Sequence, residues 1–443
     1  MRRAILVSLV AGACIGVAAA CIPARAQNLM DIYQLARKND PAWAAAQASY
    51  QANVEKGPQG RALLLPAIIF TADASQNNIN EQEPGPFSSS YLSRGYALTL
   101  IQPLYQKSSF AAYAEGKLAV TQAQAELAIA RQNLMLRTAR AYFSVLAAQD
   151  ALRFAKAKKK AISGQLLLAR HNFEVGTSTI VDVNAAQAQY DSAVSAEVVA
   201  DNNLSVERDM LSTITDTPVH ALATLTSSLP LELPAPLNID SWTRAAEQQS
   251  PQIMVARQAV AIAGEEVKKS RAGHYPSLDL FASANYSNGT MPGFPGTIIY
   301  HANSVGVQLQ WPIFSGGAIS SRVRQSLARE DQARQILTQT KRHAVLSTRQ
   351  YYLAVTSGVA QVKALEQAQT ASKKALESTE LGYRTGLNTG LDVLDAQQSL
   401  FQVENALSQA KYAYLISKLE LEDAVGTLNE NDLVSVNNLL TGH

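Results

Sequence analysis

The chain has 443 residues and a formal net charge of +2, with 47% hydrophobic and 17% charged residues. The near-neutral charge removes the electrostatic case for nucleic acid binding, and the ordinary hydrophobicity argues against a helical membrane protein. Glycine (23) and proline (16) are scarce for this length. The elements should therefore be few and long, which disfavours a doubly wound enzyme or a β-sandwich.

Residues 1–26 have the pattern of a secretory signal peptide. A basic start precedes an apolar run, and Ala24-Arg25-Ala26 supplies a small-residue cleavage site. Both cysteines, Cys14 and Cys21, lie in this segment, so the exported chain would contain no cysteine. The alternatives are a single membrane anchor or a lipid on Cys21, which would make the protein a lipid-anchored peripheral coiled coil.

The remaining chain contains two similar halves, whose matching residues are offset by 210 positions. The matching pairs include Ala36 with Ala246, Pro41 with Pro251, Pro66 with Pro276, Gly176 with Gly386 and Asp182 with Asp392, while Pro103 and Pro312 differ by 209. A constant offset along the chain indicates a tandem duplication. We therefore expect a first repeat at 27–217, a linker or equatorial segment at 218–238, a second repeat at 239–428 and a C-terminal segment at 429–443.

Each repeat contains two segments of about ten residues in which apolar and polar side chains alternate. In the first β-hairpin, 67–102, strands are expected at 67–76 and 91–102, joined by a polar loop. In the second β-hairpin, 277–313, a Gly/Pro loop is expected at 288–296. Alternating segments of this length with turn signals between them are typical of outer-membrane β-strands.

The rest of each repeat is expected to be helical. A helix at 29–61 opens the first repeat, and pairs of long helices are expected at 107–214 and 317–425. The apolar residues between 107 and 170 mostly recur every three or four positions, as in a coiled-coil seam. A helix of that length would extend about 95 Å, roughly three times the hydrocarbon thickness of a bilayer. These helices must project away from the membrane.

Four strands cannot close a barrel, and open strand edges do not survive in lipid. Two, three or four chains sharing one barrel would give eight, twelve or sixteen strands. The sequence therefore implies a symmetric homo-oligomer without fixing the number of chains.

The chain resembles the TolC family of outer-membrane efflux and type I secretion channels. The resemblance is carried by Asn28-Leu29-Met30-Asp31, the two halves, GYRTGLNTGLDVLDAQQSL at 382–400 and GTLNENDL at 426–433. It implies an α+β membrane protein of a Gram-negative bacterium. Three chains would form a twelve-stranded outer-membrane β-barrel, with four strands per chain, continued by a long α-helical coiled-coil barrel across the periplasm.

The resemblance also implies a passive exit duct in a tripartite efflux pump or a type I secretion system. A periplasmic adaptor protein and an inner-membrane transporter would be its partners, and the sequence does not specify the cargo. The alternative is a non-conducting coiled-coil spacer or receptor anchored in the outer membrane. The six histidines are scattered and no catalytic or phosphate-binding motif is found, so we expect neither an enzyme nor a cofactor.

Asp392 and Asp395 are spaced i, i+3 and should share one face of a helix. The resemblance matches them to an acidic ring at the family's periplasmic entrance. In a threefold assembly, six such carboxylates should raise one another's pKa and attract cations. The alternative is that the aspartates stabilise a first helical turn. It is stronger for Asp392, whose counterpart is Asp182, than for Asp395, whose counterpart is Ala185.

Tyr383 and Asp182 match family residues that link the coiled coils and hold the entrance shut, although ordinary packing near a turn is the alternative for Tyr383. The arginine of the family's second link is replaced by Asn388, and its partner position is Val181. That link should be absent, which predicts a more weakly held closed state.

The segments NFEVGTSTIVDV (172–183) and GYRTGLNTGLDV (382–393) should form the tips of the helical hairpins, with Gly176 and Gly386 in the turns. The resemblance implies that these tips meet the adaptor. The plainer interpretation, in which each glycine ends a helix, holds in either case.

Overall fold

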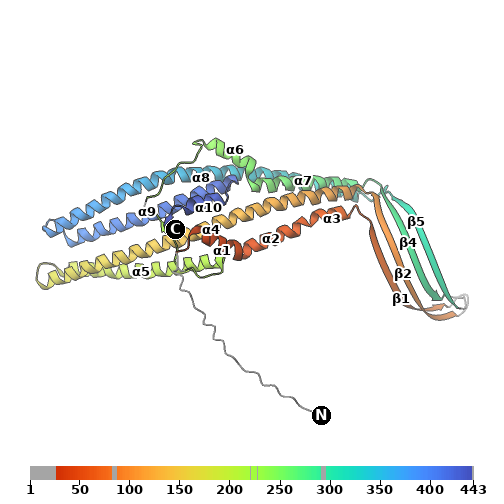
Figure 1. The fold of residues 1–443 in the computed structure, drawn as a ribbon, viewed down its shortest axis with the longest axis horizontal. Coiled ribbons are helices and arrows are strands. Elements are labelled where there is room, and N and C mark those ends of the chain that lie inside the picture. The colour runs from red at the N-terminus through yellow and green to blue at the C-terminus, as the bar shows by residue number, and fades with distance from the viewer. Residues whose placement is uncertain (1–25, 82–86, 220, 227, 291–295, 442–443) are drawn as a thin grey trace, which may run out of the picture.

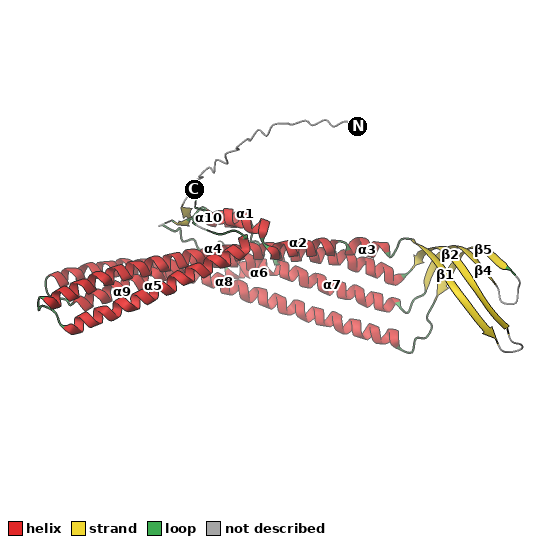
Figure 2. Ribbon diagram, turned by 90° about the horizontal axis from the view of Figure 1, so that it is seen from below, coloured by secondary structure: helices red, strands yellow, loops and turns green. Residues whose placement is uncertain are grey.

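The computed structural model describes residues 26–81, 87–219, 221–226, 228–290 and 296–441 (Figure 1). All of the expected signal peptide except its last residue lies outside this set, and so does Cys21. The described chain is an elongated array of helices with one β-sheet at its end (Figure 2). Among the described helices, none is long and apolar enough to cross a bilayer.

The sheet is formed by four antiparallel strands in the order β1-β2-β4-β5. These are β1 (Ala67–Glu81), β2 (Phe87–Tyr105), β4 (Ser277–Thr290) and β5 (Thr297–Gln310). Both strands of the first hairpin extend into the segment that we expected to be a polar loop. Paired polar side chains hold this extension together, because Ser90 bonds Asn78 at 2.7 Å and Ser88 bonds Asn80 at 2.8 Å across the strands.

The strand register shows the same duplication as the sequence. Ala67 lies opposite Ile101 in the first hairpin, and Ser277 lies opposite Gln310 in the second. These pairs differ by 210 residues on one strand and by 209 on the other, as do the matched prolines in the sequence. The two hairpins are therefore the same structural unit used twice.

The alternation predicted from the sequence gives the sheet one apolar face and one polar face. The register aligns Phe70 with Leu98 and Leu280 with Val307 on the apolar face. Asp73 and the other residues of the opposite parity form the polar face. On the apolar face the side chain of Phe70 is 66% exposed and that of Val307 is 57% exposed. Apolar side chains exposed together on one face of a sheet fit contact with lipid rather than water.

Aromatic rings lie at the far end of the apolar face. Tyr96 stacks on Tyr286 with ring centroids 4.6 Å apart, and His301 meets Tyr286 edge-on at 5.1 Å. Between Leu278 and Tyr286 the apolar face extends about 27 Å along the strand. These nine residues fit the roughly 9–11 residues that a tilted transmembrane strand needs, and outer-membrane barrels bound their apolar band with aromatic rings.

The helix expected at 29–61 is divided into three. They are α1 (Leu29–Asn39), α2 (Pro41–Val54) and α3 (Lys56–Ala62). The break at Asp40 has a local cause, because Pro41 cannot donate to a preceding turn and the Asp40 carboxylate instead caps the Trp43 amide at 2.7 Å. Arg137 pairs with the buried Asp40 at 2.7 Å. The second repeat has the same break between α6 (Ile239–Gln249) and α7 (Pro251–Ala272).

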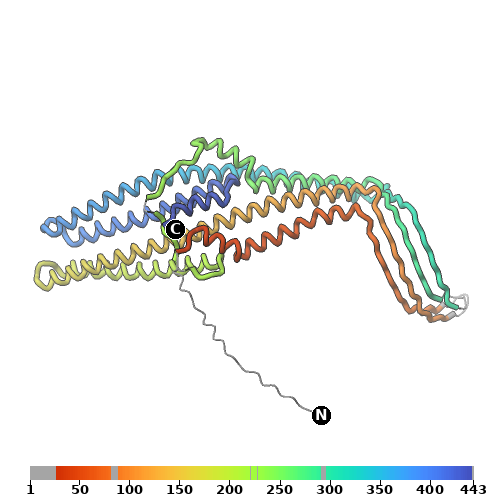
Figure 3. The backbone as a smooth tube through the Cα atoms, viewed as in Figure 1, coloured from red at the N-terminus to blue at the C-terminus, as the bar shows by residue number. Residues whose placement is uncertain are grey.

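Four long helices form two antiparallel hairpins. The first contains α4 (Lys107–Glu174) and α5 (Ile180–Thr215), and the second contains α8 (Ala318–Arg384) and α9 (Gly390–Val425). Both hairpins lie side by side and end at the tip opposite the sheet (Figure 3). Next to the sheet, the N-terminal halves of α4 and α8 lie with α2, α3 and α7 in a single layer of helices (Figure 2).

The main apolar core lies midway along the rod, where the start and the end of the described chain meet. There α10 (Glu430–Asn437) and the short strands β3 (Thr224–Leu225) and β6 (Leu440–Thr441) pack against the long helices. The buried Tyr142 hydroxyl donates to the Ala223 carbonyl at 2.7 Å and lies 3.3 Å from the Gln27 carbonyl. This contact fixes Gln27 at the middle of α4.

Candidate functional site at the helical hairpin tips

The two hairpin tips have the same backbone geometry. Gly176 and Gly386 adopt φ values of 78° and 79°, a left-handed conformation that costs glycine little and other residues more. In the first turn, two successive amides donate to the Asn172 carbonyl, and in the second turn two donate to the Gly382 carbonyl, at 2.8 and 3.2 Å in each case. These are helix-terminating turns in which glycine is required by the backbone.

Each tip is followed by a capping box. The Asp182 carboxylate accepts from the Thr179 amide at 2.9 Å and from its hydroxyl at 2.8 Å. Asp392 accepts from Thr389 in the same way, at 2.7 and 2.8 Å. The Thr-x-x-Asp spacing that predicts such a box is visible in the sequence.

The mutual effect of six carboxylates on the pKa of Asp392 in a threefold assembly stays a prediction, while within one chain the helix cap shifts this pKa in the opposite direction. Hydrogen bonds from the amide and hydroxyl of Thr389 lower the pKa of this exposed carboxylate. The pKa of Asp182 is lowered for the same reason, with Ser178 adding a further hydrogen bond. Both groups are therefore held in the charged state.

Asp395 differs from Asp392 in its environment. It is exposed one turn further along α9, and it makes no hydrogen bond or ion pair with any residue in the described part of the chain. The two carboxylates share one helix face. One is engaged by the helix cap while the other is free to meet solvent or a ligand.

The structure does not bring Tyr383 and Asp182 together within the chain. Instead, the Asn172 amide donates to the Tyr383 hydroxyl at 3.2 Å, which joins α4 of the first repeat to α8 of the second. Asp182 is occupied by its own cap. No sequence pattern pointed to Asn172, because its partner lies 211 residues away.

Asn388 bonds inside its own hairpin. Its side-chain amide lies 3.4 Å from the Thr379 carbonyl, and it fits there because Gly382 has no side chain: a Cβ at Gly382 would lie only 2.5 Å from the Asn388 nitrogen. Val181, in the expected partner position, is 69% exposed. Asn388 therefore stabilises the turn of the second hairpin rather than linking it to the first.

A second polar contact joins the repeats further from the tips. Asp150 on α4 accepts from the Tyr412 hydroxyl on α9 at 2.8 Å and also bonds Ser408, while Arg153 pairs with it at 2.9 Å. Burial, followed by the Asp150 charge, raises the pKa of Tyr412, so this hydroxyl stays a donor. The main apolar core ends close by at Leu152. Between Leu152 and the hairpin tips, the described residues of the two repeats share few buried contacts.

The chain matches the family model described as outer membrane efflux protein twice, over residues 32–215 and 242–427, which is once for each repeat. It is 36% identical over 414 residues to the outer membrane protein TolC of Vibrio cholerae, covering 93% of each chain. It is 30% identical over 421 residues to the alkaline protease secretion protein AprF of Pseudomonas aeruginosa, covering 92% of this chain and 86% of that protein.

Solved structures have the same fold. The Campylobacter jejuni CmeC outer membrane channel superposes with a TM-score of 0.80 at 18% identity, over 93% of this chain and 89% of CmeC. The Vibrio cholerae outer membrane protein VceC gives 0.76 at 20% identity, over 90% and 96%. Family membership decides against a non-conducting spacer and against catalysis. The chain belongs to the TolC family, and it is an outer-membrane efflux or secretion channel protein of Gram-negative type.

Proposed function

We propose that three copies of the chain form one channel, in which their sheets close a single twelve-stranded barrel and their helices continue it as a periplasmic tunnel. The observation that carries this proposal is the sheet itself. Its apolar face fits lipid, but the outer edges of β1 and β5 have no partner among the described residues. Unpaired backbone groups cannot remain in lipid, and neighbouring copies would supply the missing strands.

In this proposal the channel is a passive exit duct of an efflux pump or a type I secretion system. An inner-membrane transporter supplies the energy, and a periplasmic adaptor joins it to the hairpin tips. Apolar side chains at these tips favour such a contact, since Leu387 is 84% exposed and Val175 is 59% exposed. Both sit next to the glycine turns at Gly176 and Gly386. A protein partner would bury this apolar surface.

The entrance of the duct would lie between the tips. Asp392 and Asp395 would line it with carboxylates and attract cations, and the lowered pKa of Asp392 supports a charge that persists in mildly acidic surroundings. The Tyr383–Asn172 contact would hold the two hairpins of each chain together when the entrance is closed. Opening would be a loosening of the α8–α9 hairpin.

Single-channel recording of the mature protein in planar bilayers tests this function. We expect a cation-selective conductance that cobalt hexammine blocks from the periplasmic side. In the Asp392→Asn/Asp395→Asn variant, the block should weaken by about tenfold. The Asp201→Asn/Asp209→Asn variant removes two exposed carboxylates from α5 and should behave as wild type. Silent trimers would contradict the duct, and an unaltered block in the first variant would contradict the acidic entrance.

A further inference from the structure

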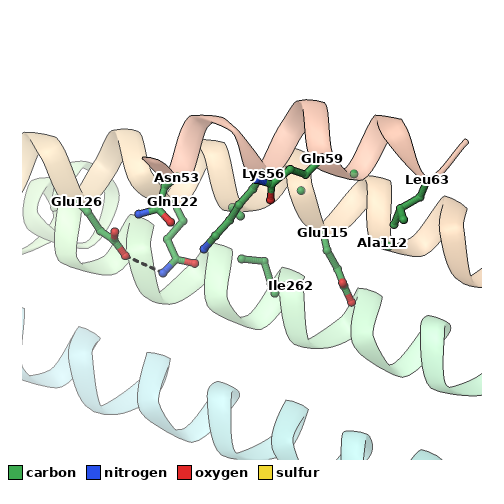
Figure 4. A pocket seen from close by; sticks show the side chains of 12 residues that line it. Asn53, Lys56, Gln59, Leu63, Ala112, Glu115, Gln122, Glu126 and Ile262 are labelled. Carbon is green, nitrogen blue, oxygen red and sulfur yellow. Dashed lines mark hydrogen bonds between the residues drawn. The ribbon is translucent and has the colours of Figure 1, made fainter. Parts of the chain in front are cut away.

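Three cavities lie along the helical layer, in the part that adjoins the sheet. The first, of about 720 Å³, lies between α3, α4 and α7, and Lys56 and Glu115 extend towards it (Figure 4). A second cavity of about 480 Å³ shares Glu115 with the first and is also lined by Glu266 and Arg329. A third, of about 440 Å³, shares Glu266 with the second. Neighbouring cavities in this row therefore share a lining carboxylate.

The third cavity, here called the junction cavity, lies where the helices meet the strands. It is lined by Lys107, Lys269, Tyr275, Ser277, Gln310 and Arg322. Ser277 and Gln310 are register partners and have the parity of the polar face of the sheet. The opposite face is the one that fits lipid. In a closed barrel, the junction cavity therefore faces the inside of the channel.

Cations outnumber carboxylates around this site. Lys107, Lys269 and Arg322 line the junction cavity, against the single carboxylate of Glu266. Neither Lys107 nor Arg322 has an acidic partner in the described part of the chain; the Lys107 ammonium lies 3.6 Å from the centre of the Tyr275 ring. An aromatic ring is a weak partner that leaves the positive charge uncompensated.

The nearby glutamates are already engaged. Lys269 lies 2.8 Å from Glu266 and 3.2 Å from Glu115, so this lysine is the partner of both carboxylates. Burial, followed by the hydrogen bond to Glu266, raises the pKa of Glu115. Lys107 and Arg322 therefore keep a positive field across the cavity.

We propose that the junction cavity is an anion-binding subsite on the channel wall, which receives carboxylate or phosphate groups of cargo passing from the helical tunnel into the barrel. The inference rests on the proposed duct. It gives the channel opposite charges at its two ends, carboxylates at the tips and ammonium and guanidinium groups below the barrel. Cargo with both kinds of group would be attracted at both places.

The test compares two charge-matched double variants in bilayers of neutral phosphatidylcholine. Lys107→Gln/Arg322→Gln removes the unpaired cations of the cavity. Lys117→Gln/Arg324→Gln is the control, because both residues are exposed and neither lines any of the three cavities. Lys117 also contacts an aromatic ring, that of Tyr113 at 4.4 Å, as Lys107 contacts Tyr275.

The reversal potential in a potassium chloride gradient reports selectivity, and pyrophosphate added from the barrel side reports anion binding. We expect the cavity variant to lower the chloride-to-potassium permeability ratio by about threefold and to lose the pyrophosphate block, while the control matches wild type. Equal shifts in both variants, or an equal block in all three proteins, would overturn the subsite.

Failure of the duct would appear differently, as a wild-type trimer without conductance. In that case calorimetric titration of pyrophosphate into the detergent-solubilised protein tests the subsite alone. Binding by wild type and by the Lys117→Gln/Arg324→Gln control, but not by Lys107→Gln/Arg322→Gln, would support it. Equal binding by all three proteins, or no binding to wild type, would overturn it.

Discussion

At the tip of the second hairpin, Asp392 has both a structural role and an electrostatic role. Asp392 closes a capping box with Thr389, which satisfies amides at the start of α9 that have no partner within the helix. The same hydrogen bonds keep the carboxylate charged by lowering its pKa. Asp395 has no such cap. Substitutions at the two positions should therefore differ in their effect on the tip.

A pH dependence of tip stability follows from the lowered pKa values of Asp182 and Asp392. For a carboxyl whose pKa is lower in the folded state, the stabilisation is present above the unfolded value near 3.8 and is lost as the pH falls through the folded value. Hydrogen exchange of residues 177–185 and 387–395, corrected for intrinsic rates, should show protection that is constant from pH 7 to 5 and falls below pH 4. In Asp392→Asn, the second segment should lose this pH dependence while the first keeps it. Protection in wild type that is unchanged down to pH 3 would contradict the caps.

Between Asp150 and the tips, the two helical hairpins are joined by few polar contacts among the described residues. The Asn172–Tyr383 hydrogen bond lies at the tips, and Asp150 with Tyr412 lies further up the rod. Between them the buried apolar cluster that spans both hairpins is small, formed by Ile162, Ala193 and Leu394. Such a segment can open locally at low cost, which suits a movable entrance.

Removing the tip contact should favour the open entrance. Tyr383→Phe and Asn172→Ala each delete one partner of the same hydrogen bond, worth about 1 kcal/mol. Each should raise the resting conductance of the channel in bilayers, and the double variant should add little to either one, since both remove a single interaction. Tyr190→Phe is the control, because no hydrogen bond of its hydroxyl is found among the described residues. Additive effects, or an equal rise in the control, would contradict a shared contact.

Much of this architecture was predictable because it depends on local periodicity and on the duplication. The two hairpins of strands and the long helix pairs follow from alternation and from the scarcity of glycine and proline. The helix expected at 29–61 was wrong because Pro41 and the Asp40 cap break it. The capping role of Asp392 had a visible Thr-x-x-Asp signal. Asn172, Ser408 and the junction cavity had none, because their partners lie far away in the sequence and meet only in the fold.

At the scale of the whole molecule, the position of Gln27 limits what a lipid on Cys21 could do. Gln27 is held beside Tyr142, and 35 residues of α4 separate Tyr142 from the foot of the sheet at Lys107, a distance of about 50 Å. The six residues from Cys21 to Gln27 reach at most about 21 Å. An acyl chain on Cys21 therefore cannot enter the membrane that surrounds the barrel of the same molecule.

We accordingly expect Cys21→Ser to leave outer-membrane insertion unchanged. Fractionation of membranes, followed by extraction with urea at alkaline pH, checks this, with wild type as the reference. Mass spectrometry of the mature protein should give an N-terminus at Gln27 without a lipid. Release of the Cys21→Ser variant into the soluble fraction would show instead that a lipid anchors the chain.

In the proposed trimer, three chains close one barrel through β1 and β5. Under the duplication β5 corresponds to β2 and β1 to β4, so the pairing of Thr99 with Ser283 predicts that Gln308 of one chain lies opposite Asp73 of the next. Both residues have the parity of the polar face. Since both native cysteines precede residue 27, cysteines introduced at these two positions would be the only thiols of the processed chain.

The most direct measurement is oxidation of the Asp73→Cys/Gln308→Cys variant in outer membranes with copper phenanthroline, followed by non-reducing electrophoresis. We predict a covalent species of three chains that a reductant returns to monomers. The control Asn77→Cys/Gln308→Cys is four residues, about 13 Å, out of register and should stay monomeric. An end product of two or four chains, or monomers from both variants, would contradict a barrel shared by three copies.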